Sequence, residues 1–552
     1  MATIAQYFHA RRDDGAPALR FEDQSWDYRD YVQECADRAA LFESLRLPIA
    51  PHIGVLLENV PDFAFWLGAA AMCGATIVGI NPTRRGAELE RDIAHTECQL
   101  IVTESSQRGL LDGLDLGAAS GPGRIVDVDS LAYNALLRAH AGAEVPPESA
   151  ASAESQFLLL FTSGTSGAPK AVICSQGRLH RMSSAVVGFV DLDQPDVAYL
   201  SMPMFHSNAI ITGWAAALVA GSTLALRRRF SASAFMDDIR RFGATYANYV
   251  GKPLTYVLAT PARPDDRDHT LRRLFGNEAA EADIARFSER FGVVVRDGYG
   301  STESSASISR TPDTPTGSLG RGPDGIVIIS QDTEKECPRA AFDTHGRLLN
   351  ATDAIGEIVN LQGGAMFEGY WNNPEANAER VRGGAYHTGD LGYRDDAGFF
   401  YFAGRSAEWL RVDGENFAGA PIERILARFP PIQLGVVYAV PDPEVGDRVM
   451  CALQLAPGCT FDPAAFRAFL EEQTDLGPKW MPTFVRIVSE FPMTETNKVV
   501  KRTLQSQRWL TSDPVWWRPS RRGAYELLQH AGLDDLRRQF AERGRSALLE
   551  SN

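Results

Sequence analysis

Short apolar blocks follow one another along the N-terminal part of the chain, and their period alternates between that of a helix and that of a strand. Apolar residues recur near helical spacing between Asp27 and Phe42, whereas Ile53 begins an uninterrupted apolar run typical of a buried strand. The next blocks predict a helix from Pro61, a strand at Thr76, a helix from Ala87 and a strand at Gln99. Such alternation favours an α/β fold in which helices cover both faces of a parallel or mixed sheet.

A second set of strand patterns lies near the C-terminus. Residues 434–440 and 449–455 read as two strands, followed by a helix from Pro463 and a strand over 483–488. These elements predict a small α+β domain. The predicted divisions are a large domain over 1–406, the small domain over 407–504 and an extension over 505–552.

Two stretches lack a clear strand or helix pattern. Residues 118–154 are rich in Gly, Ala, Pro and Ser, and we interpret them as a surface connection. The extension carries Trp509, Trp516 and Trp517 and an amphipathic stretch over 533–540. It either packs on the body of the protein or mediates association, and the sequence leaves both open.

Two uncharged runs are long enough to raise the question of a membrane span. The run 63–80 contains three glycines and changes from alanine-rich to β-branched at Thr76, as a helix turning into a strand would. The run 197–226 is interrupted by Pro203 and Gly213. We interpret both runs as core.

Composition narrows the class of protein. The 552 residues are more than one ordinary core accommodates, so at least two domains are expected. The net charge is −15 with dispersed Lys and Arg, which excludes a nucleic-acid footprint and a polybasic membrane anchor. Seven scattered cysteines without a Cys-x-x-Cys pair indicate reduced thiols, and the N-terminus lacks a signal-peptide core. We expect a cytoplasmic protein; peripheral membrane contact and homodimerisation stay open.

The stretch Phe161–Lys170 carries the clearest candidate chemistry. It reads Phe-Thr-Ser-Gly-Thr-Ser-Gly-Ala-Pro-Lys and directly follows the apolar residues 157–160. An apolar run that ends in a hydroxyl- and glycine-rich turn is typical of a buried strand delivering a loop to a phosphate. Glycines let backbone amides approach a ligand, hydroxyls add donors and the lysine adds a cation. The candidate contacts are Thr162, Ser163, Gly164, Thr165, Ser166, Gly167 and Lys170.

Two other interpretations of this loop fit less well. A Walker A loop needs a Gly-Lys-Ser/Thr step, whereas Ala168 and Pro169 separate Gly167 from Lys170. A solvated linker has no reason to follow an apolar strand or to carry a Pro-Lys step before another apolar run. The loop is therefore predicted to bind a phosphate without being a P-loop.

Polar side chains also stand where other predicted strands end. His206 follows an apolar stretch that begins at Ala198 and is expected to be a strand ending at the histidine. Residues 293–303 close on Asp-Gly-Tyr-Gly-Ser-Thr-Glu, whose aromatic, hydroxyl and carboxylate suit an adenine face, a phosphate and Mg²⁺. Asp390 begins the turn-like step Asp-Leu-Gly. Taken singly, a lone histidine, an acidic turn and a turn aspartate are more often structural.

In this order the motifs resemble the adenylate-forming enzymes, the superfamily of acyl-CoA synthetases, peptide-synthetase adenylation domains and firefly luciferase. The resemblance implies that the protein uses ATP, Mg²⁺ and CoA. It implies that His206 lies beside the acyl pocket, that Thr302 and Glu303 are catalytic with Glu303 the metal ligand, and that Asp390 binds ribose. The further implied ATP contacts are Gly276, Asn277, Glu278, Asp297, Gly298, Tyr299 and Gly300. Residues 356–359 and 363–375 match family stretches that we interpret as structural.

The resemblance also assigns roles around residue 410. Arg405 would contact ribose or phosphate, and Ala407, two residues later, would be the hinge between domains. Alanine departs from the Asp or Lys often found at that hinge. The implied CoA contacts are Arg411, Gly414 and Glu415.

The last motif is Thr494-Glu-Thr-Asn-Lys498, which resembles the terminal lysine loop of the family. Asn497 replaces the usual Gly, but Asn tolerates left-handed backbone, so the loop can still present Lys498. The resemblance implies that Lys498 bridges the substrate carboxylate and the α-phosphate. Outside this context a loop lysine is usually a solvated charge.

Details of the motifs indicate a branch. Ala171 after Lys170, the Gly-Asn-Glu at Gly276 and the Gly-Glu-Asn at Gly414 are most similar to the very-long-chain acyl-CoA synthetase and fatty-acid transport protein branch. That branch includes enzymes acting on fatty acids and on carboxylated sterol side chains. An amino-acid substrate is disfavoured, because His206 stands where peptide-synthetase domains usually place an Asp.

The resemblance therefore implies an AMP-forming acyl-CoA ligase that acts on a fatty-acid or sterol side-chain carboxylate. Two alternatives share the fold. One is an acyl-AMP ligase that passes the acyl group to a carrier protein, and the other is a non-catalytic lipid-binding or transport protein. Neither the acyl preference nor the acceptor follows from the sequence.

Overall fold

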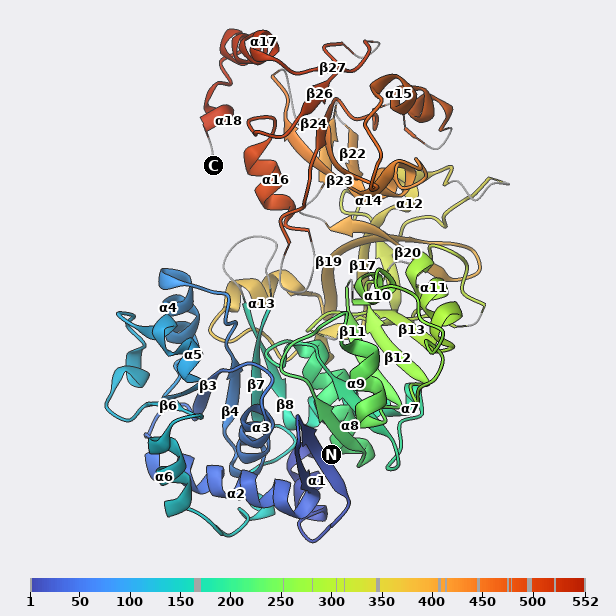
Figure 1. The fold of residues 1–552 in the computed structure, drawn as a ribbon. Helices are drawn as coiled ribbons and strands as arrows, with labels where there is room; N and C mark the ends of the chain where they lie inside the picture. The colour runs from blue at the N-terminus through green and yellow to red at the C-terminus, as the bar shows by residue number, and fades with distance from the viewer. Residues whose placement is uncertain are drawn as a thin grey trace. The chain divides into compact units, whose positions relative to one another are not determined.

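The computed structural model describes the chain as two compact units. Met1–Ser307 with Ala365–Val381 form the first, and Ile308–Gly364 with Arg382–Asn552 form the second (Figure 1). The described residues are 2–162, 170–251, 253–279, 281–303, 305–311, 313–343, 348–405, 409–412, 415–443, 447–473, 476–477, 479–493, 499–520 and 523–550. The predicted division at residue 406 falls outside them, so the domain limits stay a prediction.

One sheet of the first unit has the strand order β6-β5-β3-β4-β7-β8. Its strands are β3 (His52–Leu56), β4 (Thr76–Gly79), β5 (Leu100–Thr103), β6 (Ile125–Asp127), β7 (Gln156–Thr162) and β8 (Lys170–Ser175). Neighbours from β6 to β7 are parallel, which confirms the alternating pattern. β8 runs antiparallel to β7, because the few residues between Thr162 and Lys170 are too short for a crossover helix.

Helices α1 to α6 lie before or between the strands of this sheet along the chain. They are α1 (Ile4–Ala10), α2 (Tyr28–Leu45), α3 (Pro61–Cys73), α4 (Gly86–His95), α5 (Ser105–Arg108) and α6 (Leu131–Ala139). α3 is apolar and buried on nearly all sides, and it packs against α1, α2 and β4 (Figure 1). The uncharged run 63–80 is therefore a core helix followed by a strand. In the part of the chain that the structure describes, no helix is both long and apolar enough to cross a bilayer.

The stretch 118–154 is more than the predicted surface connection, because it contains β6 and α6. β6 has only three residues, too few for a recognisable pattern. α6 has one buried side chain, Tyr133, which donates to Asp62 Oδ1 at 2.7 Å and accepts from Trp66 Nε1 at 3.0 Å. The Gly-, Ala-, Pro- and Ser-rich composition around this helix led the sequence interpretation to a connection instead.

The other sheet of the first unit contains β13-β12-β11-β9-β10-β1-β2 in that order. Its strands are β1 (Pro17–Phe21), β2 (Gln24–Asp27), β9 (Val197–Leu200), β10 (Thr223–Leu226), β11 (Tyr246–Val250), β12 (Arg273–Asn277) and β13 (Val294–Tyr299). All neighbours are parallel except β1 and β2. The carboxyl ends of the parallel strands therefore meet at one edge, where α/β sheets bind ligands. The remaining helices of this unit are α7 (Gln176–Val190), α8 (Ala215–Ala220), α9 (Phe235–Phe242), α10 (Pro253–Leu258), α11 (Glu281–Phe291) and α13 (Pro374–Arg380).

β9 is shorter than predicted, since it ends at Leu200 rather than at His206. Pro203 cannot donate to a strand ladder, so regular pairing stops before it. The intervening loop is instead fixed by Asn59, whose Nδ2 donates to Met202 O at 2.9 Å and whose Oδ1 accepts from Met204 N at 2.9 Å. The loop that leads to His206 is therefore held by the buried side-chain amide of Asn59 rather than by strand pairing.

Asp196 anchors the opposite edge of this sheet. Its side chain is 2% exposed and contacts Arg272 at 2.5 Å, Arg273 at 2.7 Å and Thr245 Oγ1 at 2.7 Å. Burial alone would raise the pKa of this carboxyl, but hydrogen bonds from Thr245 and the Asp193 amide and the charge of Arg273 outweigh it and hold that pKa below its ordinary value. The ionised form is thus the stable one in the fold.

We expect Asp196→Asn to lower the free energy of unfolding at pH 7 by roughly 1.5–3 kcal/mol, because charge-assisted hydrogen bonds are lost. A carboxyl with a lowered folded-state pKa stabilises the fold above its unfolded pKa, and this contribution is lost as the pH falls through the folded value. The difference between variant and wild type should therefore shrink below about pH 4. Urea denaturation at several pH values tests this. Asp23→Asn is the control. The Asp23 carboxylate pairs with Arg241 but is 97% exposed, so its removal should change the free energy of unfolding little at any pH.

The second unit contains two sheets and a hairpin. One sheet has the order β16-β17-β19-β20-β15-β14, with β14 (Ile308–Ser309), β15 (Gly320–Arg321), β16 (Ile326–Ile329), β17 (Gly356–Asn360), β19 (Ala385–Arg394) and β20 (Phe399–Arg405). β18 (Val381–Arg382) lies where the chain passes from the first unit to the second. The hairpin is β21 (Trp409–Val412) with β22 (Glu415–Ala418). The helices are α12 (Ala351–Ala354), α14 (Gly419–Leu426), α15 (Pro463–Glu472), α16 (Lys501–Gln507), α17 (His530–Glu542) and α18 (Ala547–Glu550).

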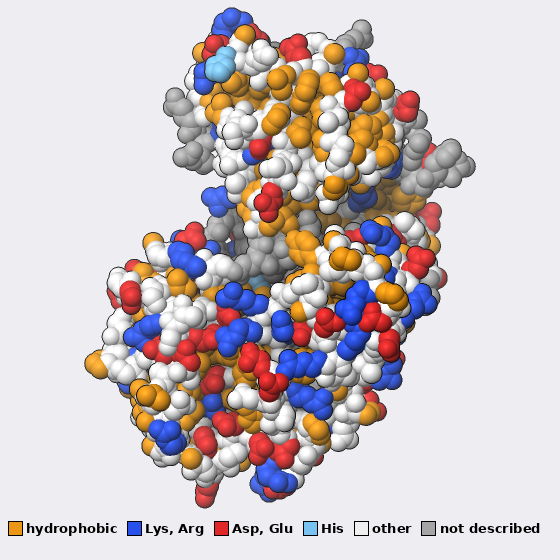
Figure 2. Space-filling view, in the orientation of Figure 1, with side chains coloured by type: hydrophobic (Ala, Val, Ile, Leu, Met, Phe, Trp, Pro, Cys, Tyr) orange, Lys and Arg blue, Asp and Glu red, His pale blue; other side chains and the backbone are white. Residues whose placement is uncertain are grey.

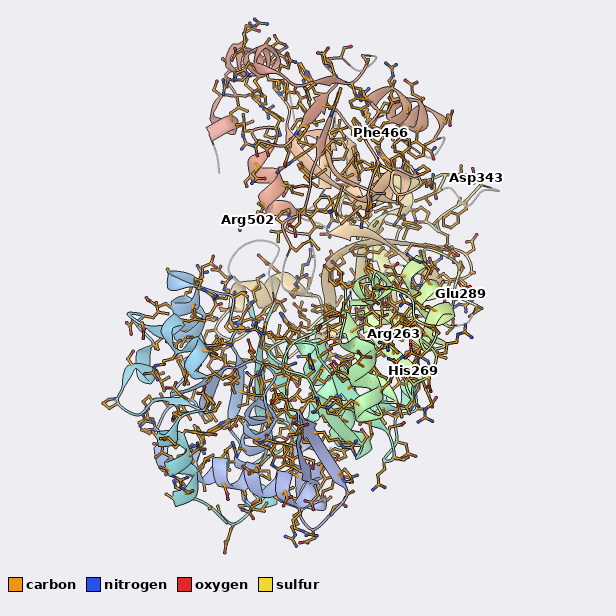
Figure 3. The ribbon with its side chains drawn as sticks, viewed as in Figure 1. Arg263, His269, Glu289, Asp343, Phe466 and Arg502 are labelled. Atoms are coloured by element: carbon orange, nitrogen blue, oxygen red, sulfur yellow. The ribbon has the colours of Figure 1, made fainter. Side chains whose placement is uncertain are left out.

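The five-stranded sheet of the second unit corresponds to the predicted α+β region. Its order is β23 (Ile432–Pro441), β24 (Asp447–Leu455), β25 (Phe484–Ile487), β26 (Val515–Trp517) and β27 (Glu526–Leu527). Phe466 of α15 is fully buried and packs with Phe429, Phe461 and Tyr525 on one side of it (Figure 3). The predicted helix and strands of this region are confirmed.

The C-terminal extension packs on this same sheet. β26 pairs antiparallel with β25, and Trp509 stacks on Phe484 with ring centroids 4.6 Å apart. Leu536 and Phe540 of α17 are buried in the same apolar cluster as Trp509. The extension therefore completes the core of the second unit.

Charged side chains are mixed on the molecular surface. Figure 2 shows Lys and Arg interspersed with Asp and Glu over the face of the first unit that it presents. This agrees with the dispersed charge of the sequence.

Candidate active site

The predicted phosphate loop joins β7 to β8. Residues Phe157–Leu160 of β7 are almost fully buried, as the apolar run predicts. Thr162 ends β7 and pairs with Lys170, the first residue of β8, and its Oγ1 donates to Lys170 O at 3.4 Å. The ladder thus fixes both ends of the loop. The loop contacts predicted between them, Ser163, Gly164, Thr165, Ser166 and Gly167, lie outside the described residues.

The carboxyl ends of β12 and β13 bring the predicted nucleotide residues together. A Cβ on Gly276 would lie 2.2 Å from Tyr249 O, so only glycine fits this close strand pairing. Asn277 Nδ2 donates to Gly298 O at 2.6 Å, which ties the two strand ends to each other. Asp297 is buried and accepts from Tyr249 Oη at 2.8 Å.

The remaining predicted residues lie at or just after the carboxyl ends of β12 and β13. Glu278 takes a left-handed backbone with φ of 67°, and the amide of Ala279 donates to Asp297 Oδ2 at 3.2 Å. Tyr299 is the last residue of β13 and Gly300 follows it. The turns predicted at 276–278 and 297–300 are therefore held together by hydrogen bonds at the ends of β12 and β13.

His206 lies near the same edge, at the entrance to a π-helix over Ala209–Trp214 (η4). Its ring centroid is 4.2 Å from that of Phe205, and its carbonyl accepts from the amide of Ile210. Ser207 Oγ and Thr302 Oγ1 are 2.8 Å apart. Ser207, the neighbour of the predicted acyl-side residue His206, thus contacts the predicted catalytic residue Thr302. Single-turn π-helices are frequent at functional sites.

The side chain of Glu303 is buried and hydrogen-bonded. It is 6% exposed, and its Oε1 accepts a hydrogen bond from Tyr370 Oη at 2.7 Å. Arg380 Nε donates in turn to Tyr370 Oη at 3.1 Å. Burial and then the Glu303 carboxylate raise the pKa of Tyr370, so the phenol stays protonated and remains a donor. Tyr370 was interpreted as structural from the sequence, and its contact with Glu303 was not foreseen.

Arg178 holds the backbone beneath Glu303. Its side chain is 3% exposed, and its Nη2 donates to Thr302 O at 3.2 Å and also to Glu303 O. Its Nη1 donates to Ile173 O at 2.5 Å. A buried guanidinium with three carbonyl acceptors ties β8 and α7 to the turn that ends in Glu303. Sequence reasoning missed Arg178, since an arginine at a helix start carries no motif of its own.

The donor set around Glu303 fits Mg²⁺. Among the residues that the structure describes, no group of three or more His, Cys, Asp and Glu could hold a metal. Magnesium does not need such a cage, since it is usually bound through one or two carboxylates with water and substrate phosphates. Tyr370 donates to Oε1, and no described residue donates to Oε2, so Glu303 could offer Oε2 to a magnesium ion that also binds phosphates.

The predicted ribose residue lies in the second unit. Asp390 is in β19, directly after Gly389, whose φ is 72°. The Asp390 amide donates to Thr388 Oγ1 at 3.0 Å, and Asp390 is paired with Arg405 of β20. The backbone therefore sets the predicted ribose carboxylate opposite the predicted ribose or phosphate arginine.

Several predicted residues fall partly or wholly outside the described part of the chain. Ala407, Gly414 and Lys498 are not among the described residues. For Arg405, Arg411 and Glu415 only the backbone is described. Arg411 lies in β21 and Glu415 begins β22, so two of the three implied CoA contacts lie on neighbouring paired strands.

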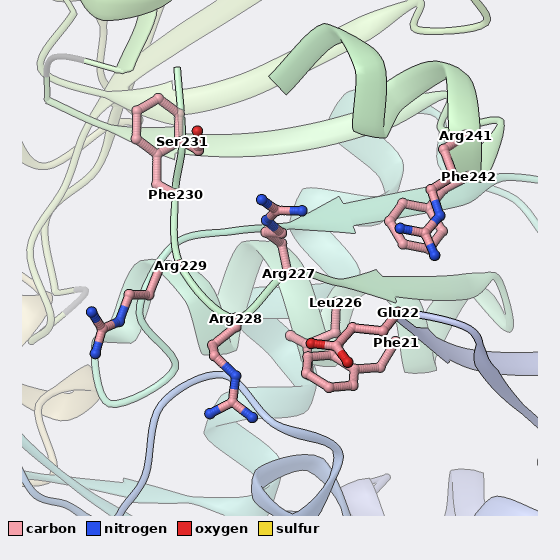
Figure 4. Close-up of a pocket in the computed structure, with 10 residues that line it drawn as sticks. All are labelled: Phe21, Glu22, Leu226, Arg227, Arg228, Arg229, Phe230, Ser231, Arg241 and Phe242. Atoms are coloured by element: carbon pink, nitrogen blue, oxygen red, sulfur yellow. The ribbon is translucent and has the colours of Figure 1, made fainter. Parts of the chain in front are cut away.

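A pocket of about 340 Å³ lies elsewhere in the first unit, beside the carboxyl end of β10 (Figure 4). It is lined by Phe21, Glu22, Leu226, Arg227, Arg228, Arg229, Phe230, Ser231, Arg241 and Phe242. Each arginine has a carboxylate partner: Asp238 for Arg227, Glu104 for Arg228, Glu58 for Arg229 and Asp23 for Arg241. Since its positive charges are balanced, we do not interpret this pocket as a nucleotide site.

Comparison with known proteins agrees with this geometry. The family model described as AMP-binding enzyme matches residues 8–371, and the AMP-binding enzyme C-terminal domain matches residues 421–498. Steroid-22-oyl-CoA synthetase from Rhodococcus jostii (strain RHA1) is 49% identical over 549 residues, covering 99% of each chain. Medium/long-chain-fatty-acid–CoA ligase FadD17 from Mycobacterium tuberculosis (strain ATCC 25618 / H37Rv) is 50% identical over 499 residues, covering 90% of this chain and 94% of the relative.

Solved structures show the same fold. ATP-bound MatB from Rhodopseudomonas palustris has a TM-score of 0.78 at 22% identity, covering 91% of this chain and 98% of that one. The anthranilate CoA ligase AuaEII in complex with anthranoyl-AMP has a TM-score of 0.78 at 21% identity, covering 92% and 97%. The predicted α/β fold class is confirmed. The chain belongs to the AMP-binding enzyme family, the adenylate-forming superfamily that its motifs resemble.

Proposed function

We propose that the protein is an AMP-forming acyl-CoA synthetase, an acid-thiol ligase that joins a carboxylic acid to CoA at the expense of ATP. The observation that carries the proposal is the end-to-end match to a relative named steroid-22-oyl-CoA synthetase, 49% identical over 99% of both chains. The buried Glu303, the loop ends at Thr162 and Lys170 and the strand ends at Asn277 and Asp297 support it.

In the first step an oxygen of the substrate carboxylate attacks the α-phosphorus of ATP, and the bond to pyrophosphate breaks. Donors of the loop between Thr162 and Lys170 would stabilise charge on the departing pyrophosphate. Lys498 would hold the carboxylate and the α-phosphate together, and Asp390 would accept from the ribose hydroxyls. Glu303 would hold Mg²⁺, which supplies Lewis-acid stabilisation of the phosphates when bound.

In the second step the CoA sulfur attacks the carbonyl carbon of the acyl-adenylate, and AMP leaves. The hairpin residues Arg411, Gly414 and Glu415 would line the path of CoA. A hinge at Ala407 would let the small domain serve both steps in turn, so that a reactive mixed anhydride stays in one pocket through two chemistries.

We further propose that the substrate is the side-chain carboxylate of a steroid. The match to the steroid-22-oyl-CoA synthetase extends over 549 residues and so includes most of the C-terminal extension, whereas the match to the M. tuberculosis fatty-acid ligase covers 499. The fatty-acid relatives, at 48–50% identity, favour a medium- or long-chain fatty acid as the second candidate.

A thioesterification panel tests both levels of the proposal. The purified protein is incubated with ATP, Mg²⁺ and CoA and either a steroid-22-oic acid or a series of medium- and long-chain fatty acids, and acyl-CoA is measured by mass spectrometry. We expect acyl-CoA and AMP, with the largest kcat/KM for the steroid acid. A preference for fatty acids would overturn the substrate assignment but keep the reaction.

Two outcomes would instead support the alternatives left open by the sequence. Acyl-AMP that accumulates with CoA but is transferred to a carrier protein would identify an acyl-AMP ligase. No ATP-pyrophosphate exchange with any acid would indicate a non-catalytic lipid-binding protein. Homodimerisation and peripheral membrane contact are tested separately, by light scattering of the purified protein and by its sedimentation with anionic vesicles.

A further inference from the structure

The segment that carries Tyr370 contacts both the strand that follows the phosphate loop and the turn that carries Glu303. Ile173 N donates to Gly369 O at 3.0 Å and Trp371 N donates to Ala171 O at 2.8 Å, so residues 369–371 pair with β8 in a single antiparallel β-bridge. β8 is the strand that leaves the phosphate loop. The position of Tyr370 is therefore fixed by the same strand that fixes Lys170.

The Tyr370 side chain reaches across this pairing to Glu303. Its hydroxyl donates to Glu303 Oε1 at 2.7 Å, and the phenol is 2% exposed. On the other side, Lys170 Nζ lies 5.4 Å from the centroid of the Tyr370 ring and 3.5 Å from Glu379 Oε2. One aromatic side chain thus lies between the cation that ends the phosphate loop and the carboxylate of the downstream turn.

The hydrogen bond from Tyr370 limits how the Glu303 carboxylate can rotate, and its orientation matters for metal binding. The terminal torsion of a glutamate is broad, so a carboxylate without a partner does not present one oxygen in one place. Tyr370 donates to Oε1, whereas Oε2 accepts no hydrogen bond from the described residues. Arg380 Nε donates to the same phenol oxygen at 3.1 Å, and a hydroxyl that accepts from a cation becomes a stronger donor.

We propose that Tyr370, supported by Arg380, is a positioning residue that orients the Glu303 carboxylate for Mg²⁺. This inference rests on the proposed function, in which Glu303 is the metal ligand. Partners of this kind, which contact a ligand rather than the metal, typically change metal affinity by about 10- to 100-fold when removed. Tyr370 is thereby assigned to the metal site although it belongs to a sequence stretch that had only a structural interpretation.

The test measures how strongly Mg²⁺ and nucleotide support each other's binding. The affinity of the protein for a non-hydrolysable ATP analogue is measured by calorimetry with and without Mg²⁺, and the ratio gives the coupling between metal and site. We expect Tyr370→Phe to reduce the Mg²⁺-dependent gain by about 10-fold or more while the metal-free affinity stays the same. A merely structural role would weaken both affinities together.

Two further variants sharpen the result. Arg380→Gln should lower the gain in the same direction, Arg380→Lys should restore part of it, and these variants decide the question if Tyr370→Phe does not fold. Tyr133→Phe is the matched control, because it removes another buried tyrosine-to-carboxylate bond of 2.7 Å in the first unit. It should leave the Mg²⁺-dependent gain unchanged.

Three results are distinguishable. A wild-type gain that survives unchanged in folded Tyr370→Phe, or an equal loss in Tyr133→Phe, overturns the positioning role but not the proposed function. A wild-type protein that shows no Mg²⁺-dependent gain and forms no acyl-adenylate overturns the proposed function itself. A loss confined to the Tyr370 and Arg380 variants supports the inference.

Discussion

Lys498→Ala is expected to slow acyl-adenylate formation by about 10²- to 10³-fold while leaving thioester formation from a supplied acyl-adenylate close to the wild-type rate. The side chain would act where charge develops between the carboxylate and the α-phosphate, and removing one preorganised donor from such a position typically costs this much. CoA transfer does not use that charge, because the phosphate bond has already been broken. Pyrophosphate exchange and single-turnover transfer from synthetic acyl-AMP measure the two steps separately.

Lys501 offers a matched control for this experiment. It lies three residues further along, at the start of α16, and forms an ion pair with Glu423 at 2.8 Å within the second unit. Lys501→Ala should reduce stability without a selective loss of adenylation. If Lys498→Ala impairs both half-reactions equally in a folded protein, Lys498 is structural and its catalytic assignment is wrong.

Glu303→Gln is expected to raise the Mg²⁺ concentration needed for half-maximal adenylation by about 10- to 100-fold or more. Removing a residue that only supports a metal ligand already changes metal affinity by about 10- to 100-fold. The amide keeps the size of the side chain and can still accept from Tyr370, but it no longer offers a negative oxygen to the metal. Adenylation rates across a Mg²⁺ titration at fixed ATP provide the measurement.

The control for Glu303 is another buried carboxylate of the first unit. Glu104 is 5% exposed and accepts from Arg228 at 2.5 Å and from the Glu58 amide at 3.1 Å. Glu104→Gln should lower stability, because the buried carboxylate loses its charge-assisted hydrogen bond to the partly exposed Arg228, but should leave the Mg²⁺ requirement unchanged. An unaltered Mg²⁺ requirement in Glu303→Gln would remove Glu303 from the metal site.

Local sequence patterns predicted the elements whose burial is uniform. The apolar run before Thr162 is β7, the alanine-rich run from Pro61 is α3, and the strand patterns at 434–440 and 449–455 lie within β23 and β24. In each case a continuous apolar or alternating segment packs against a core, so its period is visible in the sequence. The family motifs then indicated which strand ends carry the chemistry.

Other features depend on contacts that no local pattern contains. Tyr370 reaches Glu303 across 67 positions of sequence, and Arg178 reaches the turn before it across more than a hundred. β9 stops at Leu200 because of Pro203 and because Asn59, far upstream, fixes the following loop. Tertiary hydrogen bonds of this kind appear only once the fold is known, which is why the supporting residues of the site were missed.

The C-terminal extension illustrates the same limit. Its tryptophans were recognised as unusual, but an exposed interface and a buried core predict the same composition. The pairing of β26 with β25 and the stacking of Trp509 on Phe484 decide for the core of the second unit. Truncating this segment would therefore remove part of that core.

The central claim is that the protein activates a carboxylate as an acyl-adenylate before CoA attacks, and isotope transfer tests it most directly. A substrate acid labelled with ¹⁸O in both carboxylate oxygens is incubated with the protein, ATP, Mg²⁺ and CoA, and the nucleotide and acyl products are analysed by mass spectrometry. The proposed mechanism predicts one ¹⁸O atom in AMP and one in the acyl-CoA carbonyl, with unlabelled pyrophosphate. Label in inorganic phosphate together with ADP, or acyl-CoA formed with unlabelled AMP, would contradict it.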